Sequence, residues 1–300
     1  MENFEIFIKD YFPGFDSKSI RYGCFGNKDY SKILVLLQGR AEYMEKYHHI
    51  VKHFINRGFI VFMLDWRGQG GSVRELPNKD KGYVNDFIDY QKDLHIFLNK
   101  IVSKYLGHKK VYCLAHSMGA HNAARYIIEN KESFFSKVFL VSPMFGIKTY
   151  PLPQKSAEII SKIACKSGFK NCYVPGTGNY KETEFKNNPL TSDYEKFQDN
   201  NLYLKKHREL AVGGPTYSWL YNAFLSMNFI LKNKDKLNIN TDTKIIFGTD
   251  DGVVTEKPAY IMGNYTTHGI AKIQNARHEI MMENPEILSI FFEKADIFFS

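Results

Sequence analysis

The chain has 300 residues, of which 40 are basic and 32 acidic, so its formal net charge is +8. This length predicts one large domain, or a domain with an insertion, and provides enough chain to bury a sizeable core. The positive charge favours anionic partners such as phospholipid headgroups. We expect no nucleic-acid partner, because no arginine-rich helix or zinc-ligand spacing is present. Four cysteines are too few for a disulfide framework.

The first residues of the chain carry acidic groups and form no long apolar run, which argues against a signal peptide. No stretch approaches the ~18 uninterrupted apolar residues of a transmembrane helix. These observations predict a cytoplasmic protein. Its basic surplus adds the expectation of peripheral contact with the anionic inner face of the membrane.

Strand and helix patterns alternate through the first half of the chain. Residues 4–30 predict exposed antiparallel strands with a turn near Pro13. Short apolar runs predict buried parallel strands at residues 32–39, 59–65, 111–115 and 137–143. Helical patterns lie between them at residues 47–57 and, as a long amphipathic helix, at about 84–105. This alternation predicts an α/β fold with a mostly parallel, doubly wound sheet.

From residue 144 to residue 240 the alternation stops. Prolines, glycines and aromatic residues interrupt mainly helical patterns at residues 156–166, 193–204 and 217–233. The alternating pattern resumes with a strand from residue 243, a helix near 257–263, a strand at 269–274 and a closing helix at 285–299. We interpret residues 144–240 as a helical cap, inserted over the carboxyl edge of a core domain formed by residues 1–143 and 241–300.

A candidate nucleophile lies where a strand passes directly into a helix. In the sequence VYCLAHSMGAHNAARYI (111–127), Ser117 has Ala115 two residues before it and Gly119 two residues after it. Such a sharp strand–helix turn needs small neighbours and pushes the serine hydroxyl out at the top of the sheet, as in the G-x-S-x-G nucleophile elbow. Ala115 replaces the first glycine of that pattern and adds one methyl group.

A serine hydroxyl needs a base within hydrogen-bond reach, and the base needs an acid that orients it. Of the ten histidines, His278 is best placed, in the loop between the last strand and the last helix. The acid should follow a strand end between the serine and the histidine. Asp250 and Asp251 both qualify, and spacing alone does not choose between them.

Four motifs in their order along the chain resemble the α/β-hydrolase superfamily, and within it the monoacylglycerol lipase and lysophospholipase branch. These motifs are QGRAE at 38–42, DWRGQGGS at 65–72, HSMG at 116–119 and ARHE at 276–279. In the predicted cap, NPLTSD at 188–193 and GGPTYSW at 213–219 resemble bacterial lysophospholipases of the L2 type. The resemblance covers roughly residues 20–298 and implies an α/β-hydrolase fold.

The resemblance also implies which of the two aspartates is the acid that orients His278. Members of the family usually have G-x-x-D-x-x-V at the acid turn. Laid on residues 248–254, this pattern selects Asp251 and leaves Asp250 as its neighbour.

The resemblance implies two backbone donors for an oxyanion. The family usually begins its oxyanion loop with His-Gly, whereas this chain has Gln38 and Gly39. The donor from that loop would be the N–H of Arg40, and the second donor would be the N–H of Met118. The departure at Gln38 therefore bears on the rigidity of the loop more than on the donors.

Together these features predict a serine carboxylester hydrolase that cleaves a lysophospholipid or a monoacylglycerol through an acyl-enzyme, with no metal and no cofactor. The alternatives are a small-ester esterase, a peptidase of the proline-iminopeptidase kind, and a non-catalytic ligand-binding homologue. We assign Glu42, Tyr217 and Trp219 as candidate substrate contacts. The aromatic residues that are candidates for lining an acyl-chain pocket are Tyr150, Phe169, Tyr173, Tyr217, Trp219, Tyr221 and Phe224.

Overall fold

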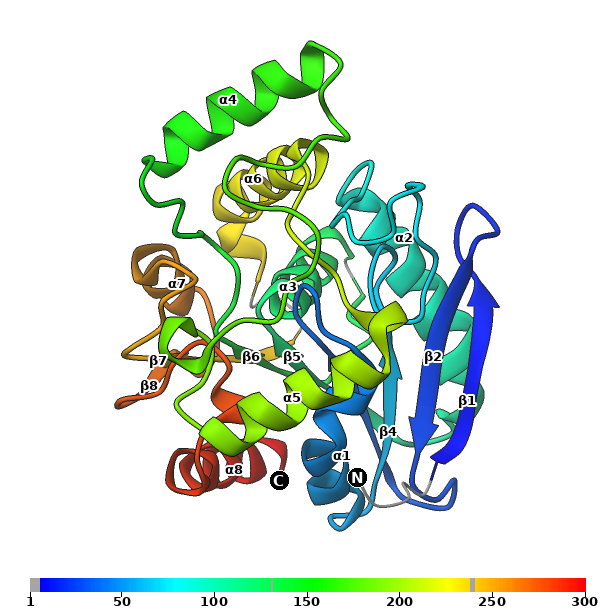
Figure 1. Cartoon of the computed structure of the whole chain (residues 1–300). Helices are drawn as coiled ribbons and strands as arrows, with labels where there is room; N and C mark the ends of the chain where they lie inside the picture. The colour runs from blue at the N-terminus through cyan, green and yellow to red at the C-terminus, as the bar shows by residue number, and fades with distance from the viewer. Residues whose placement is uncertain (1–5, 131, 238–240) are drawn as a thin grey trace.

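The computed structural model describes residues 6–130, 132–237 and 241–300. An eight-stranded sheet in the order β1-β2-β4-β3-β5-β6-β7-β8 runs through the molecule (Figure 1). Its strands are β1 (Ile6–Pro13), β2 (Ser19–Phe25), β3 (Lys32–Leu37), β4 (Phe59–Leu64), β5 (Lys110–His116), β6 (Lys137–Val141), β7 (Asp242–Gly248) and β8 (Ile270–Ile273). The β1–β2 and β2–β4 pairs are antiparallel, and every other pair is parallel. The predicted mostly parallel sheet is confirmed.

Helices cover both faces of the sheet, because successive side chains of its central strands point to opposite sides. In β3, Leu34 and Leu36 pack into one apolar cluster with α1 (His48–Ile55) and α8 (Pro285–Phe299). Ile33 and Val35 belong to the opposite cluster, which includes residues of α2 (Ile88–Ile96), α3 (Met118–Glu129) and α7 (Glu256–Gly263). The central strands are therefore buried on both faces, as their continuous apolar runs predict.

Two predicted elements differ from the structure. The strand β2 is not exposed: six of its seven residues are buried, because it lies between β1 and β4. The predicted helix at 84–105 begins only at Ile88 and ends in a π-helical and a 3₁₀ segment, Phe97–Ile101 and Val102–Tyr105. Its first part is not helical because the carbonyl of Val84 accepts a hydrogen bond of 2.8 Å from the Ser218 hydroxyl.

Three helices lie between β6 and β7, close to the predicted positions. They are α4 (Gln154–Lys166), α5 (Tyr194–Lys206) and α6 (Tyr217–Lys232). Side chains cap two of them: Asp193 accepts from the N–H of Lys196, and Thr216 from the N–H of Trp219. Figure 1 shows α4 at the outer edge of the molecule and α5 across the front of the sheet. We propose that residues 144–240 form a cap on the core domain.

The helix α6 joins the proposed cap to the core. Phe224 is buried in the same apolar cluster as α3, and the hydroxyl of Ser226 lies 2.6 Å from Nε2 of His121 on α3. None of the helices in the described ranges combines the length and the hydropathy that crossing a bilayer requires.

Candidate active site

Ser117 occupies a strained turn between β5 and α3. Its φ of 51° and ψ of −114° lie in a region that side chains other than glycine rarely adopt. The neighbouring chain holds this conformation: the N–H of Ser117 donates to the Val141 carbonyl at 2.9 Å, and the Ser117 carbonyl accepts from Met144 at 3.1 Å. The predicted elbow geometry is present.

Gly119 lets this turn approach the end of β3. A Cβ atom at this position would lie 2.2 Å from the carbonyl oxygen of Leu37 and 2.6 Å from that of Gln38. Only glycine fits such a contact with backbone atoms without displacing them. The contact therefore fixes the start of α3 against the loop that follows β3.

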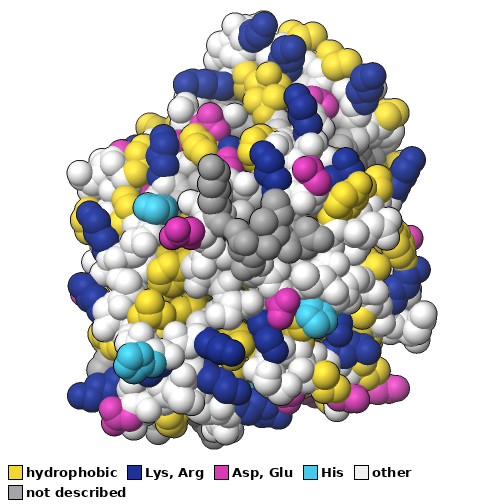
Figure 2. All heavy atoms as spheres, turned by 180° about the vertical axis from the view of Figure 1, so that it is seen from behind, with side chains coloured by type: hydrophobic (Ala, Val, Ile, Leu, Met, Phe, Trp, Pro, Cys, Tyr) yellow, Lys and Arg dark blue, Asp and Glu magenta, His cyan; other side chains and the backbone are white. Residues whose placement is uncertain are grey.

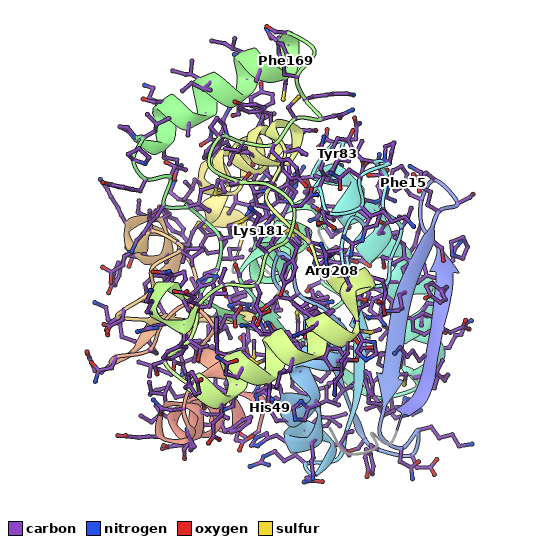
Figure 3. The ribbon with its side chains drawn as sticks, viewed as in Figure 1. Phe15, His49, Tyr83, Phe169, Lys181 and Arg208 are labelled. Carbon is purple, nitrogen blue, oxygen red and sulfur yellow. The ribbon has the colours of Figure 1, made fainter. Side chains whose placement is uncertain are left out.

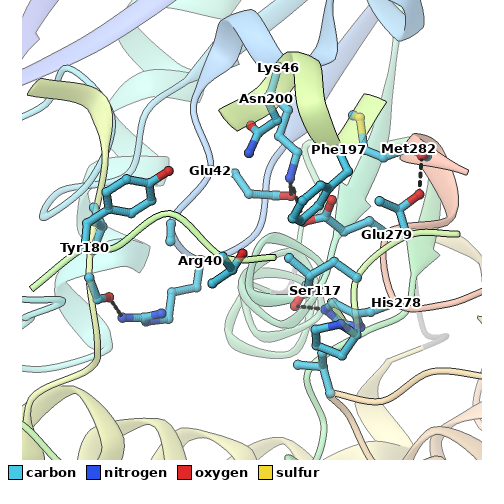
Figure 4. A pocket seen from close by; sticks show the side chains of 18 of the residues that line it. Arg40, Glu42, Lys46, Ser117, Tyr180, Phe197, Asn200, His278, Glu279 and Met282 are labelled. Atoms are coloured by element: carbon cyan, nitrogen blue, oxygen red, sulfur yellow. Dashed lines mark hydrogen bonds and ion pairs between the residues drawn. The ribbon is translucent and has the colours of Figure 1, made fainter. Parts of the chain in front are cut away.

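The structure brings together the three side chains that the sequence predicts. The Ser117 hydroxyl lies 2.9 Å from Nε2 of His278, and Nδ1 of His278 lies 2.7 Å from Oδ2 of Asp251 (Figure 4 shows the Ser117–His278 pair). All three are buried. They come from the ends of β5 and β7 and from the loop after β8, which meet at the carboxyl edge of the sheet.

Asp251, and not its neighbour, faces the imidazole. Oδ1 of Asp251 accepts hydrogen bonds from the N–H groups of Val253 and Val254 at 2.8 and 3.0 Å, which leaves Oδ2 for His278. Asp250 instead lies 3.1 Å from the Thr249 hydroxyl. Burial alone would raise the pKa of Asp251, but the His278 contact and the two backbone donors lower it below its ordinary value. The carboxylate is therefore ionised at neutral pH.

The loop after β3 is held rigidly in spite of Gln38. The side-chain amide of Gln38 donates to Oδ1 of Asp65 at 2.9 Å, and the backbone carbonyl of Gln38 accepts from the indole of Trp66 at 2.8 Å. The Gly39 carbonyl accepts from the Gln69 amide at 2.7 Å. The glutamine thus fastens the loop to the end of β4.

The two expected backbone donors are free for a ligand. In the described part of the chain, the N–H groups of Arg40 and Met118 donate to no protein acceptor. Met118 directly precedes Gly119, and Arg40 lies two residues after Gln38, whose carbonyl oxygen Gly119 approaches. This arrangement is suited to an oxyanion.

A buried charge network that the sequence did not predict lies beside the loop after β3. The carboxylate of Glu42 accepts from the N–H of Gly39, from the Tyr47 hydroxyl at 2.7 Å and from Nδ1 of His116 at 3.1 Å. Lys46 bridges Glu42 at 3.0 Å and Glu279 at 2.6 Å. The motifs QGRAE and ARHE contain both acids, but nothing in their spacing indicates that one lysine joins them.

His116 completes this network as a cation. Its Nδ1 faces the Glu42 carboxylate and its Nε2 lies 3.2 Å from the carbonyl oxygen of His278, so both ring nitrogens face acceptors. Only the doubly protonated ring can donate to both. Burial would lower the pKa of His116, but the Glu42 carboxylate raises it above its ordinary value. The ion pair therefore ties the loop after β3 to the backbone of His278.

A cavity of about 2210 Å³ opens onto Ser117 and His278. The candidate contacts Glu42, Tyr217 and Trp219 all lie on its wall, but the oxygens of Glu42 already have protein partners.

The prediction of which aromatic residues line this cavity is wrong in part. The cavity wall includes Tyr150, Tyr217 and Trp219 but not Phe169, Tyr173, Tyr221 or Phe224, and its other apolar residues include Ile147, Ile160, Phe197, Tyr203, Leu204, Leu220 and Met282.

The sequence of this chain is similar to those of known proteins. Residues 28–285 match the family described as "Serine aminopeptidase, S33". Lysophospholipase L2 of Escherichia coli is 30% identical over 220 residues, which are 73% of this chain. The match spans 64% of the E. coli protein, which is less than two thirds of its length. The probable lysophospholipase L2 of Haemophilus influenzae is 28% identical over 258 residues, covering 85% of this chain and 80% of that protein.

Solved structures share the fold at low identity. A soluble variant of monoglyceride lipase from Saccharomyces cerevisiae, in complex with a substrate analog, has a TM-score of 0.78 and 18% identity, covering 99% of this chain and 95% of that one. A thermostable carboxyl esterase from Bacillus coagulans has a TM-score of 0.75 and 17% identity, covering 98% and 99%. These similarities identify an α/β-hydrolase fold.

The Gly119 contact predicts a penalty for any side chain at that position. Gly119→Ala should lower the free energy of unfolding by about 1–3 kcal/mol, because the methyl group must displace backbone carbonyls. Urea unfolding measures this change. Gly178→Ala is the matched control, since a Cβ atom there meets nothing within 4 Å and the φ angle is not positive. Equal stability of the two variants would contradict the close contact.

The acid turn predicts different effects for two adjacent aspartates. Asp251→Asn should lower kcat for an ester substrate by as much as about 10⁴-fold, the loss seen when a triad histidine loses its orienting carboxylate. Asp250→Asn should change kcat by less than about fivefold, because its carboxylate accepts a hydrogen bond from Thr249 and not from His278. Steady-state kinetics on a p-nitrophenyl ester compares the two, and the reverse order of effects would refute the assignment.

Proposed function

The chain belongs to the serine aminopeptidase S33 family of α/β-hydrolases, and we propose that it is a serine hydrolase of single-chain lipid esters. The observation that carries the proposal is the hydrogen-bonded chain from the Ser117 hydroxyl through His278 to Asp251. Nucleophile, base and orienting acid are the parts that acyl transfer requires.

In the proposed reaction, Oγ of Ser117 attacks the ester carbonyl carbon while Nε2 of His278 accepts the hydroxyl proton. The carboxylate of Asp251 holds the resulting imidazolium. His278 then gives the proton to the leaving alcohol, and an acyl group remains on Ser117. Water, deprotonated by His278, attacks that acyl group and releases the acid. The N–H groups of Arg40 and Met118 would stabilise the oxyanion in both steps.

The cavity supports a lipid substrate. Ligand pockets commonly measure about 300–1,000 Å³, so a cavity of about 2210 Å³ leaves room for an acyl chain and a headgroup. Each buried methylene contributes about 0.8 kcal/mol, which makes an apolar slot sensitive to chain length. The names of the L2 lysophospholipases and of the monoglyceride lipase support the same substrate class.

An aminopeptidase is the second candidate, because the family description names one. Such an enzyme needs a free carboxylate for the substrate's amino group. Glu42 and Glu279, the acids beside Ser117 and His278, already share Lys46. This pairing weighs against a role of Glu42 or Glu279 in binding an amino group.

Ser117→Ala tests the proposal. We expect it to abolish labelling by a fluorophosphonate probe and to reduce ester turnover below a few per cent of the wild type, because the Ser117 hydroxyl is the group that lies 2.9 Å from Nε2 of His278. The substrate panel should include decanoyl and acetyl p-nitrophenyl esters, monodecanoylglycerol, a decanoyl lysophospholipid and a prolyl arylamide. Turnover of the arylamide alone would replace the lipid proposal by the peptidase. A preference for the acetyl ester without lipid turnover would replace it by a small-ester esterase.

We also propose that the protein makes peripheral contact with an anionic membrane surface through α4 and the residues that directly follow it. Ile159, Ile163 and Phe169 are 50%, 59% and 57% exposed, which is unusual for apolar side chains. Exposed lysines surround them at positions 155, 162, 166 and 170. Figure 2 shows hydrophobic and basic side chains interleaved at this end of the molecule. Apolar insertion and lysine attraction would act together at a lipid surface.

Vesicle binding tests this contact. The double variant Ile159→Ser with Ile163→Ser should bind phosphatidylglycerol vesicles at least about tenfold more weakly, because it loses two apolar side chains from the inserted face. Wild-type binding should also weaken with added salt. The matched control, Ile290→Ser with Ile297→Ser, removes two exposed isoleucines from α8. Equal binding by the two double variants would exclude α4 as the contact.

A further inference from the structure

Arg40 carries a positive charge that no carboxylate of the described chain neutralises. Its Nη2 donates to the Gly213 carbonyl at 2.6 Å, whereas its Nε is buried and has no hydrogen-bond partner among the described residues. Burial lowers the pKa of Arg40 to about 10, and the acids that oppose this effect are the tyrosines Tyr90 and Tyr173 rather than a carboxylate. The side chain remains protonated at neutral pH, with most of its N–H donors unused.

The other arginines show how unusual this is. Arg21 and Arg67, which are buried, bind carboxylates of Asp65 and Asp93. Arg74 has no acid, but its guanidinium donates to carbonyl oxygens of several residues. The remaining ones pair with an acid or bind two carbonyls, namely Arg57, Arg125, Arg208 and Arg277. The half-buried Arg40 differs, because it meets a single carbonyl oxygen and keeps a buried Nε without a partner, which leaves capacity for a partner outside the chain.

The guanidinium is held in one place before any ligand arrives. It lies over the indole of Trp219, 5.2 Å from the ring centroid. It also packs against Gly82, where a Cβ atom would lie 2.4 Å from Nη2. Arg40 belongs to the wall of the cavity that contains Ser117 and His278. Figure 4 shows the guanidinium directed toward the Tyr180 side of this cavity, away from Ser117.

We propose that Arg40 is a specificity-determining residue that binds the phosphate of a lysophospholipid headgroup while the ester lies at Ser117. This inference rests on the proposed function and narrows its substrate class to anionic-headgroup lipids over neutral monoacylglycerols. A planar guanidinium with free donors matches phosphate oxygens in a bidentate geometry.

The position of the anion follows from the chemistry of the substrate. The oxygen of the reacting carbonyl faces the N–H groups of Arg40 and Met118, so it does not need the guanidinium. A simple acyl chain has no charged group. The anion must therefore belong to the alcohol part of the ester, and in a glycerolipid with one chain that group is the phosphodiester.

A matched pair of substrates tests this proposal. The kcat/KM for 1-decanoyl lysophosphatidylglycerol is divided by that for 1-decanoylglycerol, both below their micellar concentrations, so that any common effect on the oxyanion loop cancels. Arg40→Met should lower this ratio about 10- to 100-fold, the value of a charge-assisted pair. Arg40→Lys should restore part of it. Lys181→Met is the control for general charge, because Lys181 is an exposed cation at the same cavity (Figure 3).

A second measurement identifies the anion. Glycerol 3-phosphate should inhibit hydrolysis of p-nitrophenyl decanoate by the wild type, and this inhibition should weaken in Arg40→Met and partly return in Arg40→Lys. If only inhibition by decanoate weakens, Arg40 binds the product carboxylate and the headgroup assignment is overturned. An unchanged substrate ratio in Arg40→Met, or an equal fall in Lys181→Met, also overturns it. A wild-type protein that hydrolyses neither lipid overturns the proposed function itself, and the inference with it.

Discussion

The contact between Gly119 and the end of β3 is the constraint on which the rest of the site depends. Because the start of α3 touches the carbonyls of Leu37 and Gln38, the strained turn at Ser117 and the loop that follows β3 lie at van der Waals distance. We propose that the N–H groups of Arg40, in that loop, and of Met118, at the start of α3, serve one oxygen. The parallel sheet supplies the remaining order, since the strands that carry Ser117 and Asp251 end at the same edge.

Buried charges hold that geometry from behind. Glu42 receives hydrogen bonds from the loop after β3, and His116 carries the connection on to the backbone of His278. Both partners of this ion pair are buried, so removing either would leave an uncompensated charge. The loop after β3, which carries the proposed oxyanion donor, and the loop that carries His278 are therefore joined by one network. Arg40, whose guanidinium lies at the same cavity, binds no carboxylate of the described residues.

Local sequence predicted what depends on local chemistry. The small residues around Ser117 predicted the elbow, and helical spacing predicted α4, α5, α6 and α8 within a few residues. The choice of Asp251 needed the family pattern, because it depends on a turn in which one carboxylate oxygen binds the N–H groups of Val253 and Val254. The sequence did not predict contacts between residues that lie far apart along the chain. Phe224 packs toward α3 and not into the cavity, and nothing in the sequence shows that the Val84 carbonyl binds Ser218.

In the proposed reaction Ser117 is the nucleophile and two backbone amides hold the oxyanion. A crystal structure of the protein after reaction with a decyl fluorophosphonate tests both roles at once. We expect a covalent bond from Oγ of Ser117 to phosphorus, with the phosphonyl oxygen about 2.7–3.1 Å from the backbone nitrogens of both Arg40 and Met118. An adduct on another residue, or a phosphonyl oxygen that binds neither amide, would contradict it.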